Sequence, residues 1–215
     1  MHSVVSEVLS EAVAAAGSRS RRIFIGVPGE FVSVVNKRVF VTLDRVRRVI
    51  DADIDFLLRK GNDFDDDGYE VINSSAVCYS VDTSDKLYFD VRGMMAGRIE
   101  ATVSYMFCET RFTDTFRTIA AEHGFKEIHF IASPWAEGLA LFEREQRDAS
   151  YVLVDIGYIS SFIAVGRGEG LCELKSFSLG GAHIAADMYE YLQVPFELAE
   201  RAKELVDHHS DRKSG

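Results

Sequence analysis

The sequence predicts an α/β fold that is interrupted by a small α+β subdomain. Two observations carry this prediction. Apolar strand-like runs alternate with amphipathic helical stretches along most of the 215 residues. In the middle of the chain, two long alternating strands and a helix form a group of their own, with boundaries near residues 41 and 128. This order of elements indicates an α+β insertion between parts of a larger α/β domain.

The composition excludes several classes of protein. With 47% hydrophobic and 27% charged residues, the chain can bury a substantial core. The formal net charge of −10 opposes binding to nucleic acid, because phosphate contacts need clustered lysine and arginine. The apolar runs are far shorter than the roughly 20 residues of a membrane span, and the first residues lack a secretory pattern. We therefore expect a cytoplasmic protein whose Cys78, Cys108 and Cys172 are reduced packing residues.

The first sixty residues are expected to form a helix, several strands and a second helix. Residues 22–28 have the pattern of a buried strand, and residues 31–41 that of one or two more. Charge spacing predicts a helix over residues 44–60, ended by Gly61. The opening helix is expected to end at Gly17. Its apolar positions recur at helical spacing: Val4, Val5, Val8, Leu9, Ala12 and Val13.

The middle of the chain supplies the inserted subdomain. Alternating apolar and polar residues predict strands over residues 70–81 and 98–108. An amphipathic helix is expected over residues 113–123, where Gly124 stops it. The residues expected to face inward are Phe112, Phe116, Ile119 and Ala120.

Residues 126–150 are expected to return to the larger domain. A strand over residues 126–132 precedes Ser133 and Pro134, a pair typical of a helix start, with serine as N-cap and proline in the first turn. The helix is expected to run to about Arg147. The side chains expected to pack on the sheet are Trp135, Leu139 and Phe142.

The last third of the chain is expected to form a hairpin over residues 151–165 and a strand over residues 171–179. The first strand of the hairpin delivers Asp155 and Gly157 into a tight turn. Three strands followed by a helix is the order of a ribonuclease H-like half domain. The two helices expected after the strands cover residues 182–192 and 196–208.

Five motifs follow one another along the chain: IFIGVPG at residues 23–29, ASPWA at 132–136, VDIG at 154–157, SLGGAHIAAD at 178–187 and AERAK at 199–203. Together they resemble the actin-like ATPase superfamily, and in particular its branch of FtsA and PilM. Their order and spacing match the family from about residue 4 to residue 203, and the insertion lies where the FtsA and PilM branch carries its extra subdomain. The resemblance implies a ribonuclease H-like, actin-like domain in two subdomains.

The subdomain boundaries follow from the same resemblance. The first actin-like subdomain would comprise residues 1–40 and 129–150, and the inserted FtsA-type α+β subdomain residues 41–128. Residues 151–215 would begin the second actin-like subdomain. The first phosphate hairpin of the family would lie upstream of this chain, and the adenine-binding segment and the amphipathic tail downstream.

VDIG resembles the second phosphate loop of the family. There the acid, here Asp155, orients magnesium-bound water, so Asp155 is the implied metal and nucleotide residue. Gly157 would let backbone amides approach phosphate oxygens, and Ser160 preserves a hydroxyl. The resemblance also implies nucleotide contacts from Gly180 and Gly181, although the two glycines also suit a plain turn between strand and helix.

Glu200 and Lys203 match the ribose and adenine contacts of the family. An ordinary i, i+3 ion pair on a helix is an equally good interpretation of this spacing.

The loop departs from the family in ways that weaken it. Tyr158 and Ile159 stand where the family carries glycines, and Phe162 replaces a second acid. A β-branched residue resists a positive φ angle, and both side chains obstruct close approach of the backbone to phosphate. We therefore expect weak binding of ATP and Mg²⁺ at most, and we assign no catalytic residue.

The resemblance implies a scaffold of bacterial cell division with weak or lost ATPase activity, which links the division ring to the membrane. Its implied partners are an FtsZ-like division protein, other division proteins and copies of itself. Its implied location is the cytoplasm, and peripherally the inner face of the cell membrane at the septum, attached through segments outside this chain. Two alternatives are a PilM-like adaptor of pilus assembly and a small-molecule kinase or phosphatase. Phe162 and Tyr158 disfavour the enzyme.

Overall fold

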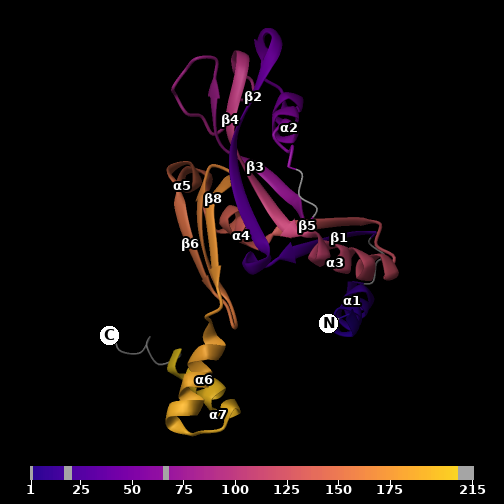
Figure 1. Cartoon of the computed structure of the whole chain (residues 1–215), viewed down its shortest axis with the longest axis vertical. Coiled ribbons are helices and arrows are strands. Elements are labelled where there is room, and N and C mark those ends of the chain that lie inside the picture. Colours follow the sequence, from indigo (N-terminus) through magenta and orange to yellow (C-terminus); the bar gives the residue numbers. More distant parts are fainter. Residues whose placement is uncertain (1, 17–20, 65–67, 208–215) are drawn as a thin grey trace.

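The computed structural model describes residues 2–16, 21–64 and 68–207 (Figure 1). The helices are α1 (His2–Ala16), α2 (Asp51–Lys60), α3 (Thr110–Glu122), α4 (Ser133–Leu141), α5 (Arg144–Ala149), α6 (Gly181–Leu192) and α7 (Phe196–Asp207), with the 3-10 turn η1 (Gly29–Phe31). The strands are β1 (Arg22–Val27), β2 (Val32–Arg48), β3 (Tyr69–Val81), β4 (Met95–Glu109), β5 (Glu127–Ala132), β6 (Tyr151–Ile156), β7 (Ser161–Arg167) and β8 (Gly170–Phe177).

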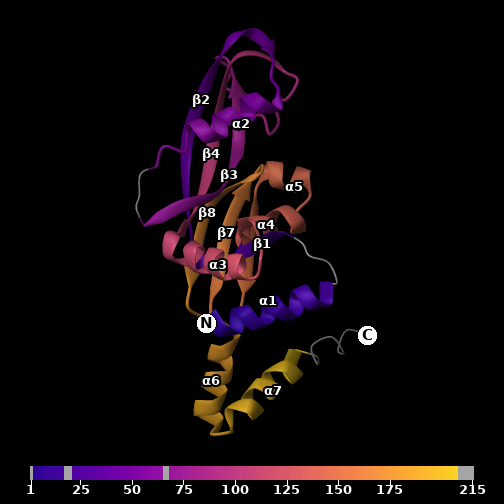
Figure 2. The same ribbon diagram turned by 90° about the vertical axis from the view of Figure 1, so that its right-hand side faces the viewer.

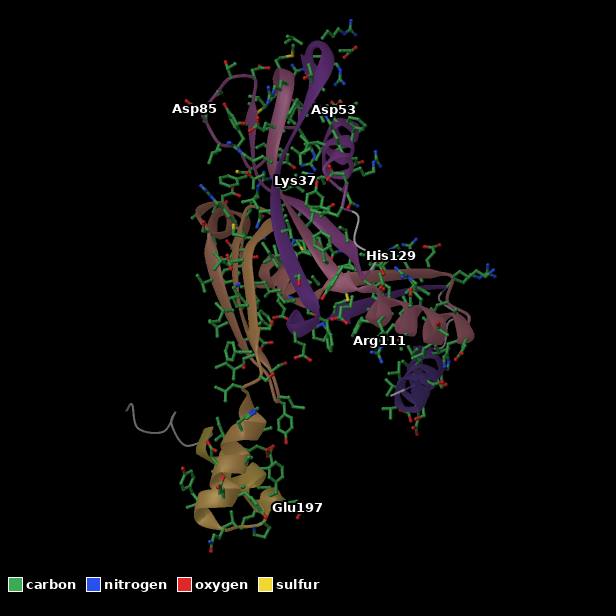
Figure 3. The ribbon with its side chains drawn as sticks, in the orientation of Figure 1. Lys37, Asp53, Asp85, Arg111, His129 and Glu197 are labelled. Atoms are coloured by element: carbon green, nitrogen blue, oxygen red, sulfur yellow. The ribbon has the colours of Figure 1, made fainter. Side chains whose placement is uncertain are left out.

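The strands form three sheets. β1 pairs with β5 in parallel, whereas the orders β2-β4-β3 and β6-β7-β8 are antiparallel. Figures 1 and 2 show the three sheets meeting in the middle of an elongated molecule, with α2 beside the upper half of β2 and β4, and α6 and α7 below β6–β8. Asp53 on α2 lies in the upper part of the molecule, and Glu197 on α7 lies near its lower end (Figure 3). The α/β class predicted from the sequence is confirmed.

Two hydrophobic clusters share the long strand β4. The upper cluster lies under α2 and includes Ile99, Val103 and Tyr105. The lower cluster includes Met106 and Cys108 and draws on β1, β5, β7 and β8. β2 passes through the expected boundary at residue 41 without a break. The division into residues 1–40, 41–128, 129–150 and 151–215 stays a prediction.

The helix predicted over residues 44–60 is wrong for its first part. β2 continues to Arg48, and α2 begins only at Asp51. Arg47 donates to both carboxylate oxygens of Asp53 at 2.7 and 2.8 Å, and Ile50 N donates to the same carboxylate at 3.0 Å. The charge pattern therefore joins the end of a strand to the first turn of a helix, instead of lining one helix face.

The single helix predicted from Ser133 to about Arg147 is also wrong, because it is two helices. Phe142 leaves the α-helical conformation, and its ring stacks on Tyr151 with 4.4 Å between centroids. The N-cap position belongs to Ala132, and Ser133 is the first helical residue, without a side-chain cap bond. Burying two aromatic rings together offsets the loss of helical hydrogen bonds at the break.

Most other predicted elements are confirmed within a few residues. α1 covers the predicted opening helix, but its expected end at Gly17 lies outside the described residues. Its apolar face is only partly covered, since Val4 and Val8 stay exposed, and Ser6 Oγ lies 2.7 Å from Nε2 of His123 beyond the end of α3. None of the helices in the described ranges could cross a lipid bilayer.

The end of β5 is fixed by a side chain from β3. Asn73 Nδ2 donates to the carbonyl of Phe130 at 3.2 Å, and its Oδ1 accepts the amide of Ala132 at 2.8 Å. Asn73 thus pairs with the outer edge of β5 as a strand would. This contact holds the start of α4 at the point where β1, β5 and the β6–β7 hairpin converge.

Candidate functional site

The turn between β6 and β7 is the centre of the candidate site. Gly157 N donates to the carbonyl of Ser160 at 3.1 Å, which closes the turn. A Cβ atom on Gly157 would lie 2.5 Å from that oxygen, so the close approach requires glycine. Residues 157–160, all described by the structure, have no positive φ angle.

A pocket of about 260 Å³ opens beside this turn. It brings together the end of β6, the turn, η1 and α4. Its lining includes three predicted site residues, Asp155, Gly157 and Ser160. The remaining lining residues are Pro28, Gly29, Glu30, Ser133, Glu137, Tyr158, Ser161, Phe162 and Ser176. The other four predicted residues, Gly180, Gly181, Glu200 and Lys203, form a separate cluster at α6 and α7.

The pocket is acidic. Its lining holds the three carboxylates of Glu30, Glu137 and Asp155, together with four serines, and no lysine or arginine. Burial and the charge of Asp155 raise the pKa of the Glu137 carboxyl. Glu30 and Glu137 were not among the residues expected from the sequence. A signal was present for Glu137, because it lies four residues after Ser133 and therefore on the same helix face.

Glu137→Gln should raise the free energy of unfolding near pH 7. Since the pKa of Glu137 is raised in the folded protein, folding retains a proton there that the unfolded chain releases. Stability therefore falls as the pH rises from the ordinary carboxyl range through the raised pKa, and glutamine removes this fall. Urea unfolding at about pH 4 and about pH 7 measures the effect, which should shrink toward the lower pH.

Glu145→Gln, at an exposed position of α5, is the matched control and should change little. A Glu137→Gln protein that is no more stable than the wild type near pH 7 would show that burial and the charge of Asp155 do not raise the pKa of the Glu137 carboxyl.

The second cluster joins the turn to the start of α6. The amide of Gly181 donates to the carbonyl of Gly157 at 2.9 Å, and the amide of Ala182 donates to the carbonyl of Tyr158 at 2.7 Å. Gly180 N donates to Nδ1 of His183 at 3.1 Å. Helix amides that usually remain without a partner are therefore satisfied by the protein itself.

The predicted pair on α7 is formed. Lys203 Nζ donates to both carboxylate oxygens of Glu200 at 3.1 and 3.0 Å, and both side chains are 22% exposed. The same ammonium donates to the carbonyl of Gly181 at 3.3 Å. Tyr158 Oη donates to Glu200 at 3.2 Å. The i, i+3 ion pair is thus present, and it is tied to the turn.

Comparisons with known proteins find relatives in sequence and in fold. No family model matches the chain. Cell division protein FtsA of Pseudomonas aeruginosa is 22% identical over 200 residues, which are 93% of this chain and 48% of that protein. FtsA of Bacillus subtilis is 21% identical over 210 residues, 97% of this chain and 47% of the relative. The chain is thus similar to FtsA in sequence along nearly its whole length.

A solved structure shows the same fold. A chain of the PilM–PilN type IV pilus biogenesis complex superposes with a TM-score of 0.59 at 12% identity, over 95% of this chain and 56% of that one. The chain spans about half the length of the curated FtsA relatives that it matches.

The arrangement does not fit the phosphates of a nucleotide. Phosphate-binding loops present successive backbone amides without protein partners, often from residues in alternating right- and left-handed helical conformations. Here the amides of Gly157, Gly180 and Gly181 already donate to acceptors within the protein. The acidic pocket would repel phosphate that arrives without a cation. The assignment of the predicted residues to ATP and Mg²⁺ stays a prediction.

Proposed function

We propose that this FtsA/PilM-like protein is an actin-like scaffold of bacterial cell division, which links the division ring to the membrane with weak or lost ATPase activity. The observation that carries the proposal is the similarity to FtsA along 93% or more of the chain in relatives from three bacteria. The acidic pocket and the internally bonded glycines support a scaffold over an enzyme.

The proposed partners follow from the family. They are an FtsZ-like division protein, other division proteins and further copies of the chain. Residues 41–128, as the proposed inserted subdomain, would supply contacts between subunits and recruit later division proteins. The proposed location is cytoplasmic and peripheral at the inner face of the cell membrane.

A PilM-like adaptor of pilus assembly is the second candidate. It is favoured by the likeness in fold to the chain of the PilM–PilN complex. Such an adaptor would hold a short peptide of a membrane partner in a groove of the inserted subdomain. A kinase or phosphatase has less support, because Phe162 is buried at the position of the second acid.

Co-sedimentation with the FtsZ-like polymer of the same organism tests the proposal. The intact protein should pellet with the polymer in a saturable manner, and a PilN-type peptide should not bind in a fluorescence anisotropy titration. Binding of the peptide without binding of the polymer would replace the proposal by the pilus adaptor. Binding of neither would overturn both.

Two equally exposed apolar side chains test the role of residues 41–128. Phe56 on α2 and Leu198 on α7 are each 52% exposed. Phe56→Asp should weaken self-association in sedimentation velocity, whereas Leu198→Asp should not, because a charge in an apolar contact is costly. The reverse pattern would place the contact at the other end of the molecule.

A further inference from the structure

Tyr158 contacts α6 and α7 through three different parts of the residue. Its carbonyl accepts the amide of Ala182 at 2.7 Å. Its hydroxyl donates to Glu200 at 3.2 Å, and its ring lies 5.1 Å from the ammonium of Lys203. One residue of the turn therefore engages the first turn of α6 and both charged residues of the α7 pair.

The three donors of the Lys203 ammonium are all engaged within the protein. Lys203 has three donors, and they meet two oxygens of Glu200 and the carbonyl of Gly181. Glu200 accepts from Lys203 and from Tyr158. A ligand that accepted a hydrogen bond from Lys203 would have to break one of these bonds.

The α6–α7 pair has few other attachments. Figures 1 and 2 show both helices standing below the β6–β8 sheet, away from the other two sheets. Within the described residues, α7 makes polar contacts with α6, with the connection at Pro195 and with Tyr158. Tyr158 is thus its polar partner outside the helix pair and the connection. The orientation of α7 relative to the turn therefore depends on its packing against α6 and on this side chain.

We propose that Tyr158 is an internal latch that holds the α6–α7 pair on the turn without any nucleotide. The tyrosine stands where the family carries a glycine, and it engages Glu200 and Lys203, which the resemblance assigns to the ribose and the adenine. The proposal of a latch is argued from these contacts alone. We also infer that the orientation of α6–α7 does not depend on ATP, and this second inference rests on the proposed function.

Amide hydrogen exchange measured by NMR on the chain tests the latch directly. The reporters are the amides of Gly181 and Ala182, which donate to carbonyls of the turn. Tyr158→Phe removes the bond to Glu200 and should speed exchange at both amides roughly three- to tenfold. Tyr158→Ala also removes the ring and should have a larger effect. Tyr191→Phe, on α6 and 83% exposed, is the matched control and should change neither rate.

Adding Mg-ATP to the wild-type chain should leave both exchange rates unchanged. Unchanged exchange in Tyr158→Ala would overturn the latch. Slower exchange of the wild type with Mg-ATP would show that a ligand sets the orientation of α6–α7. It would overturn the inference that this orientation does not depend on nucleotide. Neither readout involves an FtsZ-like partner, so failure of the proposed function in co-sedimentation is distinguishable from failure of the latch.

Discussion

Alanine at Gly180 should detach α6 from the turn that follows β6 and lower the free energy of unfolding by about 1–3 kcal/mol. The backbone of Gly180 is extended, with φ −162°, so alanine can adopt its conformation. The obstacle is space. A Cβ atom would lie 2.4 Å from the carbonyl oxygen of Gly157 and 2.6 Å from that of Tyr158.

Both obstructing atoms belong to the backbone, so they cannot rotate away. They are also the acceptors of the first α6 amides, and moving them breaks two hydrogen bonds. Urea unfolding measures the loss of stability.

The neighbouring glycine provides the matched control. A Cβ atom on Gly181 would come no closer than 3.4 Å, to Lys203 Nζ. Gly181→Ala should therefore be tolerated, or stabilise by up to about 1 kcal/mol, because alanine favours the helix. Equal losses for the two alanine variants would contradict the close packing of Gly180 on the turn.

Alanine at Gly166 should cost about 2–3 kcal/mol of unfolding free energy. Gly166 lies on β7, and its Cβ would fall 2.1 Å from the ring of Tyr151. The ring cannot retreat, because a Cβ at Gly138 would already lie 2.1 Å from the tyrosine oxygen and Phe142 stacks on the ring. The cost arises because one aromatic ring fills the space left by two glycines.

A second substitution at Tyr151 tests this explanation. Gly166→Ala combined with Tyr151→Leu should lose less than the two single changes added together, since leucine vacates the space that the new methyl needs. Gly97→Ala is the control for glycine in a strand, because its nearest neighbour would be at 3.4 Å. Strict additivity of the two changes would argue against the ring as the obstacle.

The local pattern of the sequence predicted most elements but not how they end. Alternation predicted β3 and β4 because each strand has a buried face. The strand predicted from the sequence ends too early for β2, because the charges of residues 44–48 suit a helix as well as an exposed strand. The break between α4 and α5 depends on Phe142 meeting Tyr151, a contact that local pattern does not encode.

The sequence predicted the part of the candidate site that lies on one continuous segment of the chain. Asp155 lies near the end of β6, Gly157 and Ser160 lie in the turn after it, and all three line the same pocket. Glu30 and Glu137 were missed because η1 and α4 reach the pocket only through the tertiary fold. Tyr158 was expected only as an obstacle to phosphate. Its contact with Glu200 joins residues 42 apart, which spacing along the chain cannot show.

The central proposal is that the bulky turn after β6 leaves at most weak binding of ATP at this site. Isothermal titration of Mg-ATP into the intact protein tests it most directly, with Tyr158→Gly combined with Ile159→Gly as the comparison. The wild type should give no saturable heat up to about 1 mM ATP, and the double glycine variant should bind more strongly. Tight binding of Mg-ATP by the wild type, accompanied by release of phosphate, would contradict this proposal.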